Sequence, residues 1–326
     1  MYIELEQIKG LHLELTSKCN LACLQCARTY KKFPLRELSL INLENLFNEF
    51  VNPLDIVHIC GNYGDSIVYS DLHKAIDIFK KHKTKYIRIY TNGSARGSDW
   101  WIKLGEQLKN CGEVIFSIDG LEDTNYIYRK YSSWPIIMNS VKSFINAGGK
   151  AIWEMLAFEH NEHQLYNAKK LSEKLSFSDF RIKKANRFGT LGYENDVVFP
   201  PEQDLFKHDS IIARDENIDK IGYDSFMNNQ KIHCQYKKRQ WIYIDFNGTV
   251  LPCCWFGTPW WDGELDQFKI YDKELNIKHN KLSNILKNPF YKSELENSWG
   301  NNNKAITCSI QCGNFDVSTK QNTITI

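Results

Sequence analysis

Three cysteines near the start of the chain, Cys19, Cys23 and Cys26, have the residue type and spacing best suited to chemistry. They follow a C-x3-C-x2-C pattern, which places three thiols on one short loop. Three thiolates can hold three irons of a four-iron cluster and leave the fourth iron without a protein ligand. An open iron can bind a small molecule and pass it an electron, whereas a closed four-cysteine site only stores or relays charge. The alternatives for this trio are a zinc loop and three buried thiols.

The cysteine loop follows an apolar alternation at Leu11–Leu15, which predicts a short strand just before it. A C-x3-C-x2-C loop past a first strand resembles the radical S-adenosylmethionine (radical SAM) superfamily. The resemblance implies that Cys19, Cys23 and Cys26 hold a [4Fe-4S] cluster whose open iron binds the amino and carboxylate groups of SAM. It also implies reductive cleavage of SAM to a 5′-deoxyadenosyl radical, which abstracts a hydrogen atom from a substrate.

The composition limits the classes of protein to which the chain can belong. Its 326 residues suffice for one large domain, or for one domain with a small appendage. The net charge of only +2 gives no overall field that would attract nucleic acid or a membrane surface. We expect no secretion signal in the first residues, and no apolar run approaches the ~20 residues that span a bilayer. Ten cysteines in such a chain indicate metal-bound thiolates in a reducing cytoplasm.

Up to about residue 215, short apolar runs alternate with longer amphipathic stretches, which predicts βαβ units and a parallel sheet. The predicted strands are Leu11–Leu15, Ile56–Cys60, Tyr86–Tyr90, Val114–Ile118, Ala151–Phe158 and Phe180–Lys183. The predicted helices are Leu43–Val51, Leu72–His82, Trp100–Asn110, Ile136–Ala147 and Gln164–Leu175. Units of this kind fit an α/β fold with a partial (β/α)6 barrel of the TIM type. In such barrels the working residues sit on loops after the strand C-termini.

After the second predicted strand, Tyr63, Gly64, Asp65 and Ser66 occupy the place of a Gly-Gly-Glu-Pro-like turn in the radical SAM family. In the family this turn meets the amino group of SAM, so the resemblance implies that these four residues bind the cofactor. Here a tyrosine replaces the first glycine, an aspartate the glutamate and a serine the proline. The remaining glycine makes physical sense, because glycine lets the backbone approach a ligand closely. The alternative is an ordinary strand-to-helix turn.

Further cofactor-binding candidates follow the later strands. Ser117 and Asp119 lie at the end of the fourth predicted strand, and the resemblance places them near the ribose or carboxylate of SAM. Arg129 resembles an arginine that pairs with the SAM carboxylate in related enzymes; the alternative is a solvated helix charge. Gln25 stands where the family often has an aromatic residue that packs on adenine. Stacking on adenine must therefore be supplied elsewhere, or be weaker.

A second cysteine group lies toward the C-terminus. Cys234, Gly248 and Cys253 form a C-x13-G-x4-C pattern, and Cys308 and Cys312 follow at a C-x3-C spacing. The first pattern resembles the opening of the SPASM and Twitch modules of radical SAM enzymes, which hold auxiliary iron–sulfur clusters. Four cysteines are enough for one closed [4Fe-4S] cluster, so the single-cluster Twitch form fits better than the full SPASM form. The alternatives are structural zinc and thiols without metal.

The sequence between these cysteines predicts how they meet. Residues 242–251 read as a hairpin with Asn247-Gly248 at its turn. A hairpin brings the residues that flank its two strands close together, so Cys234 and Cys253 can share a metal. Cys254 is left over, either as a spare thiol or as a replacement for its neighbour.

The remaining composition suggests two domains. The polar stretch from about 190 to 230 reads as a bridge, so we expect a radical SAM barrel over residues 1–215 and a small iron–sulfur domain over residues 216–326. The aromatic run Trp255–Trp261 either walls a pocket or packs in a core. Cys60 is expected to be a small core residue rather than a metal ligand.

The sequence therefore predicts a radical SAM oxidoreductase that uses SAM and two [4Fe-4S] clusters, one that binds SAM and one auxiliary. The expected reaction is an oxidative modification (a cross-link, dehydrogenation or rearrangement) of a ribosomal peptide or small metabolite. The expected electron donor is a protein such as flavodoxin or ferredoxin. No N-terminal peptide-recognition domain fits before residue 11, so a separate partner would have to recognise a leader peptide. The alternative from another class is a non-catalytic iron–sulfur or zinc-binding scaffold, which would not cleave SAM.

Overall fold

The computed structural model describes residues 2–184, 198–203, 218–257, 273–300, 304–313 and 323–324. The strands in these residues form a nine-stranded sheet in the order β8-β7-β1-β2-β3-β4-β5-β6-β9. Their bounds are β1 Gly10–Leu13, β2 Ile56–Ile59, β3 Tyr86–Thr91, β4 Gly112–Ser117, β5 Lys150–Ala157, β6 Asp179–Lys184, β7 Trp241–Ile244, β8 Val250–Leu251 and β9 Thr323–Ile324. Neighbouring strands from β1 to β6 pair in parallel, which confirms the predicted α/β fold with a parallel sheet.

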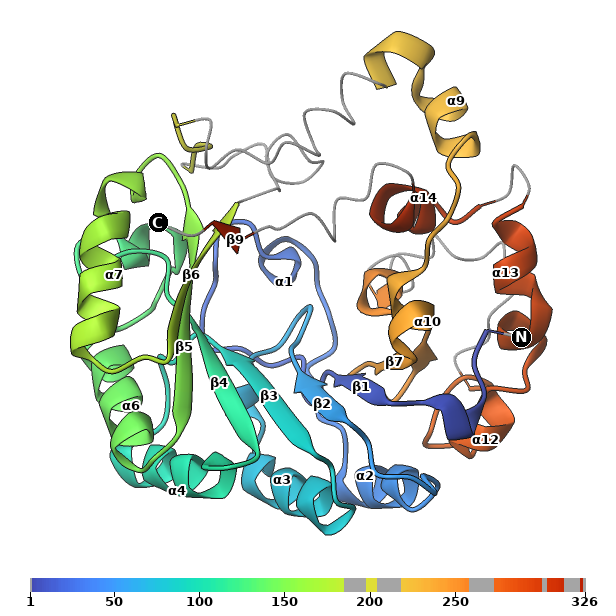
Figure 1. Cartoon of the computed structure of the whole chain (residues 1–326), viewed down its shortest axis with the longest axis horizontal. Helices are drawn as coiled ribbons and strands as arrows, with labels where there is room; N and C mark the ends of the chain where they lie inside the picture. The colour runs from blue at the N-terminus through green and yellow to red at the C-terminus, as the bar shows by residue number, and fades with distance from the viewer. Residues whose placement is uncertain are drawn as a thin grey trace.

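The helices in the first half of the chain are α1 Ala27–Tyr30, α2 Leu40–Phe47, α3 Leu72–Lys81, α4 Ser98–Leu108, α5 Asn125–Tyr128, α6 Trp134–Asn146 and α7 Leu165–Lys174. Of these, α2, α3, α4, α6 and α7 lie along the outer face of the curved sheet, whereas α1 lies on its inner side (Figure 1). The helices described in the second half are α9 Tyr223–Asn228, α10 Gln235–Arg239, α12 Leu282–Ile285, α13 Leu295–Ser298 and α14 Ile306–Cys312. None of the helices within the described ranges combines the length and apolar character that crossing a bilayer requires.

Side-chain patterning explains why the two faces of the sheet differ. In α3, apolar residues recur at helical spacing from Leu72 to Phe79, and this buried stripe belongs to the main core. In β3, Ile87 and Ile89 are fully buried in the same core. Tyr90 alternates with them and faces the inside of the barrel, where it lines a cavity. The outer face of the sheet is therefore buried in the apolar core, whereas the inner face, which carries side chains such as Tyr90, can form a site.

The C-terminal half of the chain adds two strands to the edge of the same sheet. β7 pairs in parallel with β1, so that Trp241–Ile244 lies in register with Gly10–Leu13. β8 folds back antiparallel on β7, which confirms the hairpin predicted over residues 242–251. Gly248 at its turn has a φ of 87°, a backbone conformation that favours glycine. The pairing of β7 with β1 could not be predicted, because strand patterning does not reveal which sheet edge a strand joins.

One apolar core runs through both halves. It joins Leu11 of β1 to Ile244 of β7 and to Phe290 near the C-terminal helices. A smaller buried cluster lies against the cysteine loop and consists of Leu21, Cys23, Tyr128, Phe158 and Val198. The predicted boundary after residue 215 and most of the predicted bridge from 190 to 230 lie outside the described residues. The division into two domains therefore stays a prediction.

Candidate active site

A cavity of about 450 Å³ opens at the C-terminal ends of the parallel strands. The predicted cofactor and metal residues that line it are Cys19, Cys23, Gln25, Cys26, Tyr63, Gly64, Asp65, Ser117 and Arg129. Because strand C-termini meet at one rim of a barrel, segments that are distant in the sequence reach the same space. Two predicted residues, Ser66 and Asp119, do not line the cavity. Ser66 is buried, and its hydroxyl donates to the Ile59 carbonyl at 3.3 Å.

The cysteine loop is surrounded by hydrogen-bond donors that suit thiolate sulfur. The backbone N–H of Leu21 donates to Cys19 Sγ at 3.4 Å, and Asn92 Nδ2 donates to the same sulfur at 3.8 Å. Arg129 Nη1 donates to Cys23 Sγ at 3.8 Å. N–H groups directed at sulfur stabilise its anionic form and tune a bound cluster. The chemistry of this donor set therefore fits a thiolate-bound cluster.

Burial determines the charge of these thiols before a metal binds. It raises the pKa of the Cys19 thiol to about 12, and the nearby Asp65 carboxylate adds to the effect. Burial also raises the pKa of Cys23, against the opposing charge of Arg129. A thiolate at such a position needs a compensating cation, and a coordinating metal deprotonates its thiol ligand outright. Cys19 and Cys23 are thus neutral thiols that become anionic when metal binds.

Asp65 connects the turn after β2 to the loop after β3. Its carboxylate accepts hydrogen bonds from Thr91 Oγ1 and from the backbone N–H of Asn92, each at 2.7 Å, and from Ile67 N at 3.2 Å. Burial raises the pKa of Asp65, and the hydrogen bonds from Asn92, Thr91 and Ile67 oppose that rise. The side chain lines the cavity while these contacts fix its orientation.

Asp119 and Arg129 form a buried ion pair beside the cysteine loop. Arg129 Nε lies 2.6 Å from Asp119 Oδ2, and Asp119 Oδ1 accepts from the backbone N–H of Leu156 at 2.8 Å. The arginine side chain is only 17% exposed, so it is not a solvated helix charge. In this structure Asp119 holds Arg129 in place, and Arg129 rather than Asp119 reaches the cavity.

Several residues that were not predicted to belong to the site also line the cavity. Among them are His58, Cys60, Tyr90, Glu154 and Lys183. Cys60, which was expected in the core, thus faces the cavity. Lys183 Nζ and Glu154 Oε2 form an ion pair at 3.3 Å. The signal that could have identified these positions is the regular occurrence of polar side chains on the inner face of otherwise apolar strands.

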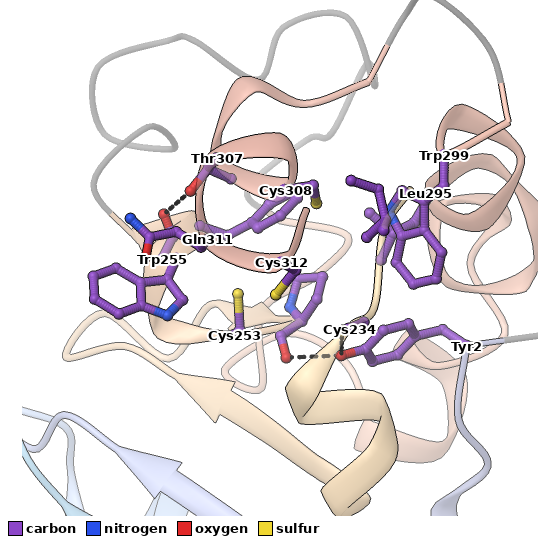
Figure 2. Close-up of a pocket in the computed structure, with 13 residues that line it drawn as sticks. Tyr2, Cys234, Cys253, Trp255, Leu295, Trp299, Thr307, Cys308, Gln311 and Cys312 are labelled. Atoms are coloured by element: carbon purple, nitrogen blue, oxygen red, sulfur yellow. Dashed lines mark hydrogen bonds between the residues drawn. The ribbon is translucent and has the colours of Figure 1, made fainter. Parts of the chain in front are cut away.

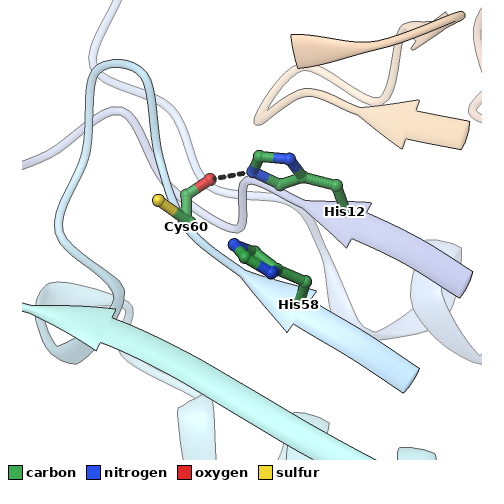
Figure 3. Close-up of side chains that lie close together, drawn as sticks. All are labelled: His12, His58 and Cys60. Atoms are coloured by element: carbon green, nitrogen blue, oxygen red, sulfur yellow. Dashed lines mark hydrogen bonds between the residues drawn. The ribbon is translucent and has the colours of Figure 1, made fainter. Parts of the chain in front are cut away.

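His12 lies close to His58 and Cys60 of this wall (Figure 3), and the possible ligand atoms of the three residues all fall within 4.8 Å of one another. Both ring nitrogens of His12 already have partners. Nε2 lies 2.7 Å from the Cys60 carbonyl oxygen, and Nδ1 lies 2.7 Å from the Tyr236 hydroxyl. A carbonyl only accepts, so Nε2 carries the proton and Nδ1 accepts from Tyr236. Burial lowers the pKa of His12 to about 4, which keeps the ring neutral. Because hydrogen bonds occupy both of its ring nitrogens, this group is not a ready metal site.

The four predicted cysteines of the C-terminal half line one small pocket (Figure 2): Cys234, Cys253, Cys308 and Cys312. A hydrogen bond between Cys312 and Cys234 lowers the pKa of Cys234 and raises that of Cys312. The Tyr2 hydroxyl lies 3.4 Å from Cys234 Sγ. Within the described ranges, no three of these four sulfurs all lie within 4.8 Å of one another. Chain segments that are far apart in the sequence thus place four thiols around one pocket, without holding three of them in close contact.

The residues next to Cys253 face in different directions. Cys254 does not line the four-cysteine pocket; its side chain hydrogen-bonds with Tyr236, and its backbone carbonyl accepts from Asn62 Nδ2 at 2.9 Å. Trp255 lines both the four-cysteine pocket and the 450 Å³ cavity. From the aromatic run Trp255–Trp261, residues 258–261 lie outside the described residues.

Comparison with protein families identifies the first half of the chain. The model of the radical SAM superfamily matches residues 13–170. These residues are a radical SAM domain. The domain begins in β1, contains all three loop cysteines and ends in α7. Membership of this domain in the radical SAM superfamily implies SAM and a [4Fe-4S] cluster as cofactors.

Individual proteins and solved structures are also similar to this chain. The chain is 23% identical over 218 residues to the mycofactocin maturase MftC of Mycobacterium ulcerans (strain Agy99), which covers 66% of this chain and 57% of MftC. Its fold resembles that of Streptococcus suis SuiB bound to the precursor peptide SuiA, with a TM-score of 0.59, 16% identity, and coverage of 88% of this chain and 66% of SuiB. It also resembles native anSMEcpe with bound AdoMet and Cp18Cys peptide, with a TM-score of 0.55, 15% identity, and coverage of 89% and 83%. The chain thus spans 57% of the length of MftC and about two thirds of that of SuiB.

Proposed function

We propose that this chain is a radical SAM enzyme that binds SAM and a [4Fe-4S] cluster in the 450 Å³ cavity. One observation carries the proposal. The loop cysteines, the Tyr63–Asp65 turn, Ser117 and Arg129 line the same cavity, although they extend from residue 19 to residue 129. A scaffold that only binds metal would have no need for these polar groups around the open side of its cysteine loop.

Each group has a distinct part in this proposal. Cys19, Cys23 and Cys26 hold three irons, which leaves the fourth for the amino and carboxylate groups of SAM. The Tyr63–Asp65 turn meets the amino group, and Arg129 has a charge that complements the carboxylate. The donors on Asn92 and Arg129 stabilise the thiolates and tune the cluster.

SAM and the cluster together supply, when bound, a 5′-deoxyadenosyl radical that removes a hydrogen atom from a substrate carbon. The protein contributes binding, orientation and exclusion of water. Tyr90, Glu154 and Lys183 present polar groups on the inner wall, where they can orient a substrate. Trp255 closes the side that faces the C-terminal half.

We further propose that Cys234, Cys253, Cys308 and Cys312 hold an auxiliary [4Fe-4S] cluster in a Twitch-like module within residues 216–326. The support is that all four line one pocket. Tetrahedral zinc with Zn–S bonds of ~2.3 Å would hold its sulfurs about 3.8 Å apart. Among the described residues, no three of the four sulfurs all lie within 4.8 Å of one another, so the thiols are not already held at the spacing of a zinc site. Because Trp255 borders both sites, an electron from a substrate radical would have a short path to the second cluster.

The proposed substrate is a peptide, and the proposed outcome is an oxidative modification such as a cross-link, dehydrogenation or rearrangement. SuiB, whose fold this chain shares, is a protein that binds a precursor peptide, and MftC is a maturase. The open cluster would take its electron from a one-electron donor such as flavodoxin or ferredoxin.

Anaerobic reconstitution with iron and sulfide counts, followed by SAM binding, tests the proposal. The wild-type protein should hold about eight irons and bind SAM. The triple variant Cys19→Ala, Cys23→Ala, Cys26→Ala should lose about four irons and SAM binding while it keeps its circular dichroism spectrum. An iron-loaded protein that does not bind SAM would support the scaffold alternative. Zinc instead of iron at the C-terminal cysteines would refute the auxiliary cluster.

A further inference from the structure

Glu14 lies buried between the turn after β2 and the C-terminal hairpin. Its side chain is only 1% exposed. One carboxyl oxygen, Oε1, accepts from the backbone N–H of Tyr63 at 2.7 Å and from that of Gly64 at 3.2 Å. The other, Oε2, accepts from the Tyr243 hydroxyl at 2.5 Å. A single side chain thus joins the end of β1, the proposed SAM turn and β7.

The segment that begins with Glu14 packs very closely against the Tyr63–Asp65 turn. Two consecutive peptide N–H groups that share one acceptor fix the orientation of both peptide planes. A Cβ added to Gly64 would lie 1.7 Å from the Thr16 carbonyl oxygen, and the backbone N–H of Asp65 donates to the Lys18 carbonyl at 2.9 Å. The segment 14–18 is therefore the surface on which the turn lies. Cys19 follows directly, so the same segment positions the cysteine loop relative to the turn.

The turn is also held from the C-terminal side. Asn62 Nδ2 donates to the Cys254 carbonyl at 2.9 Å and to the Tyr243 hydroxyl at 3.3 Å. The Tyr63 hydroxyl donates to the Gly257 carbonyl at 3.4 Å. These contacts clamp the turn between β1 and the segment that follows β8, with Glu14 at the centre.

We infer that Glu14 is a positioning residue that sets the affinity for SAM, because it holds the N–H groups of Tyr63 and Gly64 in the Tyr63–Asp65 turn. This inference rests on the proposed function, in which the turn meets SAM. The carboxyl group acts as an acceptor of these hydrogen bonds rather than as a negative charge. Burial raises the pKa of Glu14 to about 8, so the neutral acid, which still has a carbonyl acceptor, prevails at neutral pH. Glutamine has the same shape and retains such an acceptor.

Equilibrium dialysis of SAM against the anaerobically reconstituted full-length protein tests the inference. Glu14→Ala should weaken SAM binding about tenfold or more, the scale of lost hydrogen bonds in a buried site. Glu14→Gln should remain within about threefold of the wild type, because it keeps the acceptor. Glu113 is a matched control, since this 2% exposed carboxylate bonds Tyr86 and Arg88 and does not line the cavity. Glu113→Ala and Glu113→Gln should leave the SAM affinity unchanged.

Two results would overturn the inference. One is an unchanged SAM affinity in folded, iron-loaded Glu14→Ala. The other is an equal loss in the Ala and Gln variants, which would mean that the charge matters rather than the acceptor. If Glu14→Ala does not fold, Tyr243→Phe removes the hydroxyl that holds Oε2; it should weaken SAM binding about threefold, and unchanged binding would contradict the inference. A wild-type protein that does not bind SAM would instead contradict the proposed function.

Discussion

At the scale of single residues, Asp65 should influence SAM binding most directly. If its carboxylate meets the amino group of SAM, Asp65→Ala should weaken SAM binding by about 1.5–3 kcal/mol, the range for a hydrogen bond to a charged group. The same variant releases Thr91 and Asn92, so its circular dichroism must be compared with that of the wild type. Asp71→Ala is a surface control, because the partly exposed Asp71 side chain pairs with exposed Lys74 and does not line the cavity. An unchanged affinity in Asp65→Ala would show that the turn does not bind SAM in the manner of the family.

Glu14 should make the metal-free protein less stable as the pH rises. Burial raises its pKa to about 8, with a contribution from the nearby charge of Asp245, while the Tyr243 hydroxyl opposes the rise. A carboxyl group whose folded-state pKa is raised stabilises the fold fully below its ordinary pKa, and this stabilisation is lost as the pH rises through about 8. Between pH 6 and pH 8.5 the wild type should lose on the order of 2 kcal/mol more unfolding free energy than Glu14→Gln. Parallel denaturation profiles for the two proteins would contradict this expectation.

At the scale of elements, the turn after β2 depends on a glycine. A Cβ at Gly64 would lie 1.7 Å from the backbone oxygen of Thr16, which no side-chain adjustment can relieve. Gly64→Ala should therefore displace the turn, lower the melting temperature and reduce SAM affinity about tenfold or more. Gly97→Ala is the matched control, because a Cβ at Gly97 meets nothing within 4 Å. Equal SAM affinity in the two variants would remove the turn from the proposed site.

Much of the arrangement of strands and helices could be predicted from the sequence. Alternating apolar and amphipathic stretches predicted the six parallel strands closely, because burial imposes different periods on strands and helices. The residues that follow those strands could be assigned to one rim of the barrel, because the C-terminal ends of parallel strands meet at the same edge of the sheet. The role of Glu14 could not be predicted, since its partners are backbone N–H groups 49 and 50 residues away. For Asp119, the position at a strand end predicted a SAM contact, but it could not reveal that the carboxylate is turned toward Arg129.

At the scale of the whole molecule, the two halves share a sheet and a core but have separate cysteine sites. The double variant Cys308→Ala, Cys312→Ala should lose about four irons. SAM binding and some uncoupled SAM cleavage should persist, because Glu14 still holds the turn from β1. Turnover of a peptide substrate should fall to near zero if the second cluster is the electron acceptor.

The same double variant needs a test of folding, because metal binding and folding are coupled in small metal modules. Circular dichroism and hydrodynamic size should match those of the wild type if only the cluster is lost. Full turnover with half the iron would reduce the C-terminal cysteines to a dispensable structural feature.

The production of 5′-deoxyadenosine from SAM tests the central claim most directly. The reconstituted wild-type protein, given a strong one-electron reductant under anaerobic conditions, should release 5′-deoxyadenosine and methionine. The variant in which Cys19, Cys23 and Cys26 are all replaced by Ala should release none, although its C-terminal cysteines and their iron remain. Absence of 5′-deoxyadenosine from the fully iron-loaded wild type, or its continued release by the triple variant, would contradict the claim that this loop and cavity cleave SAM.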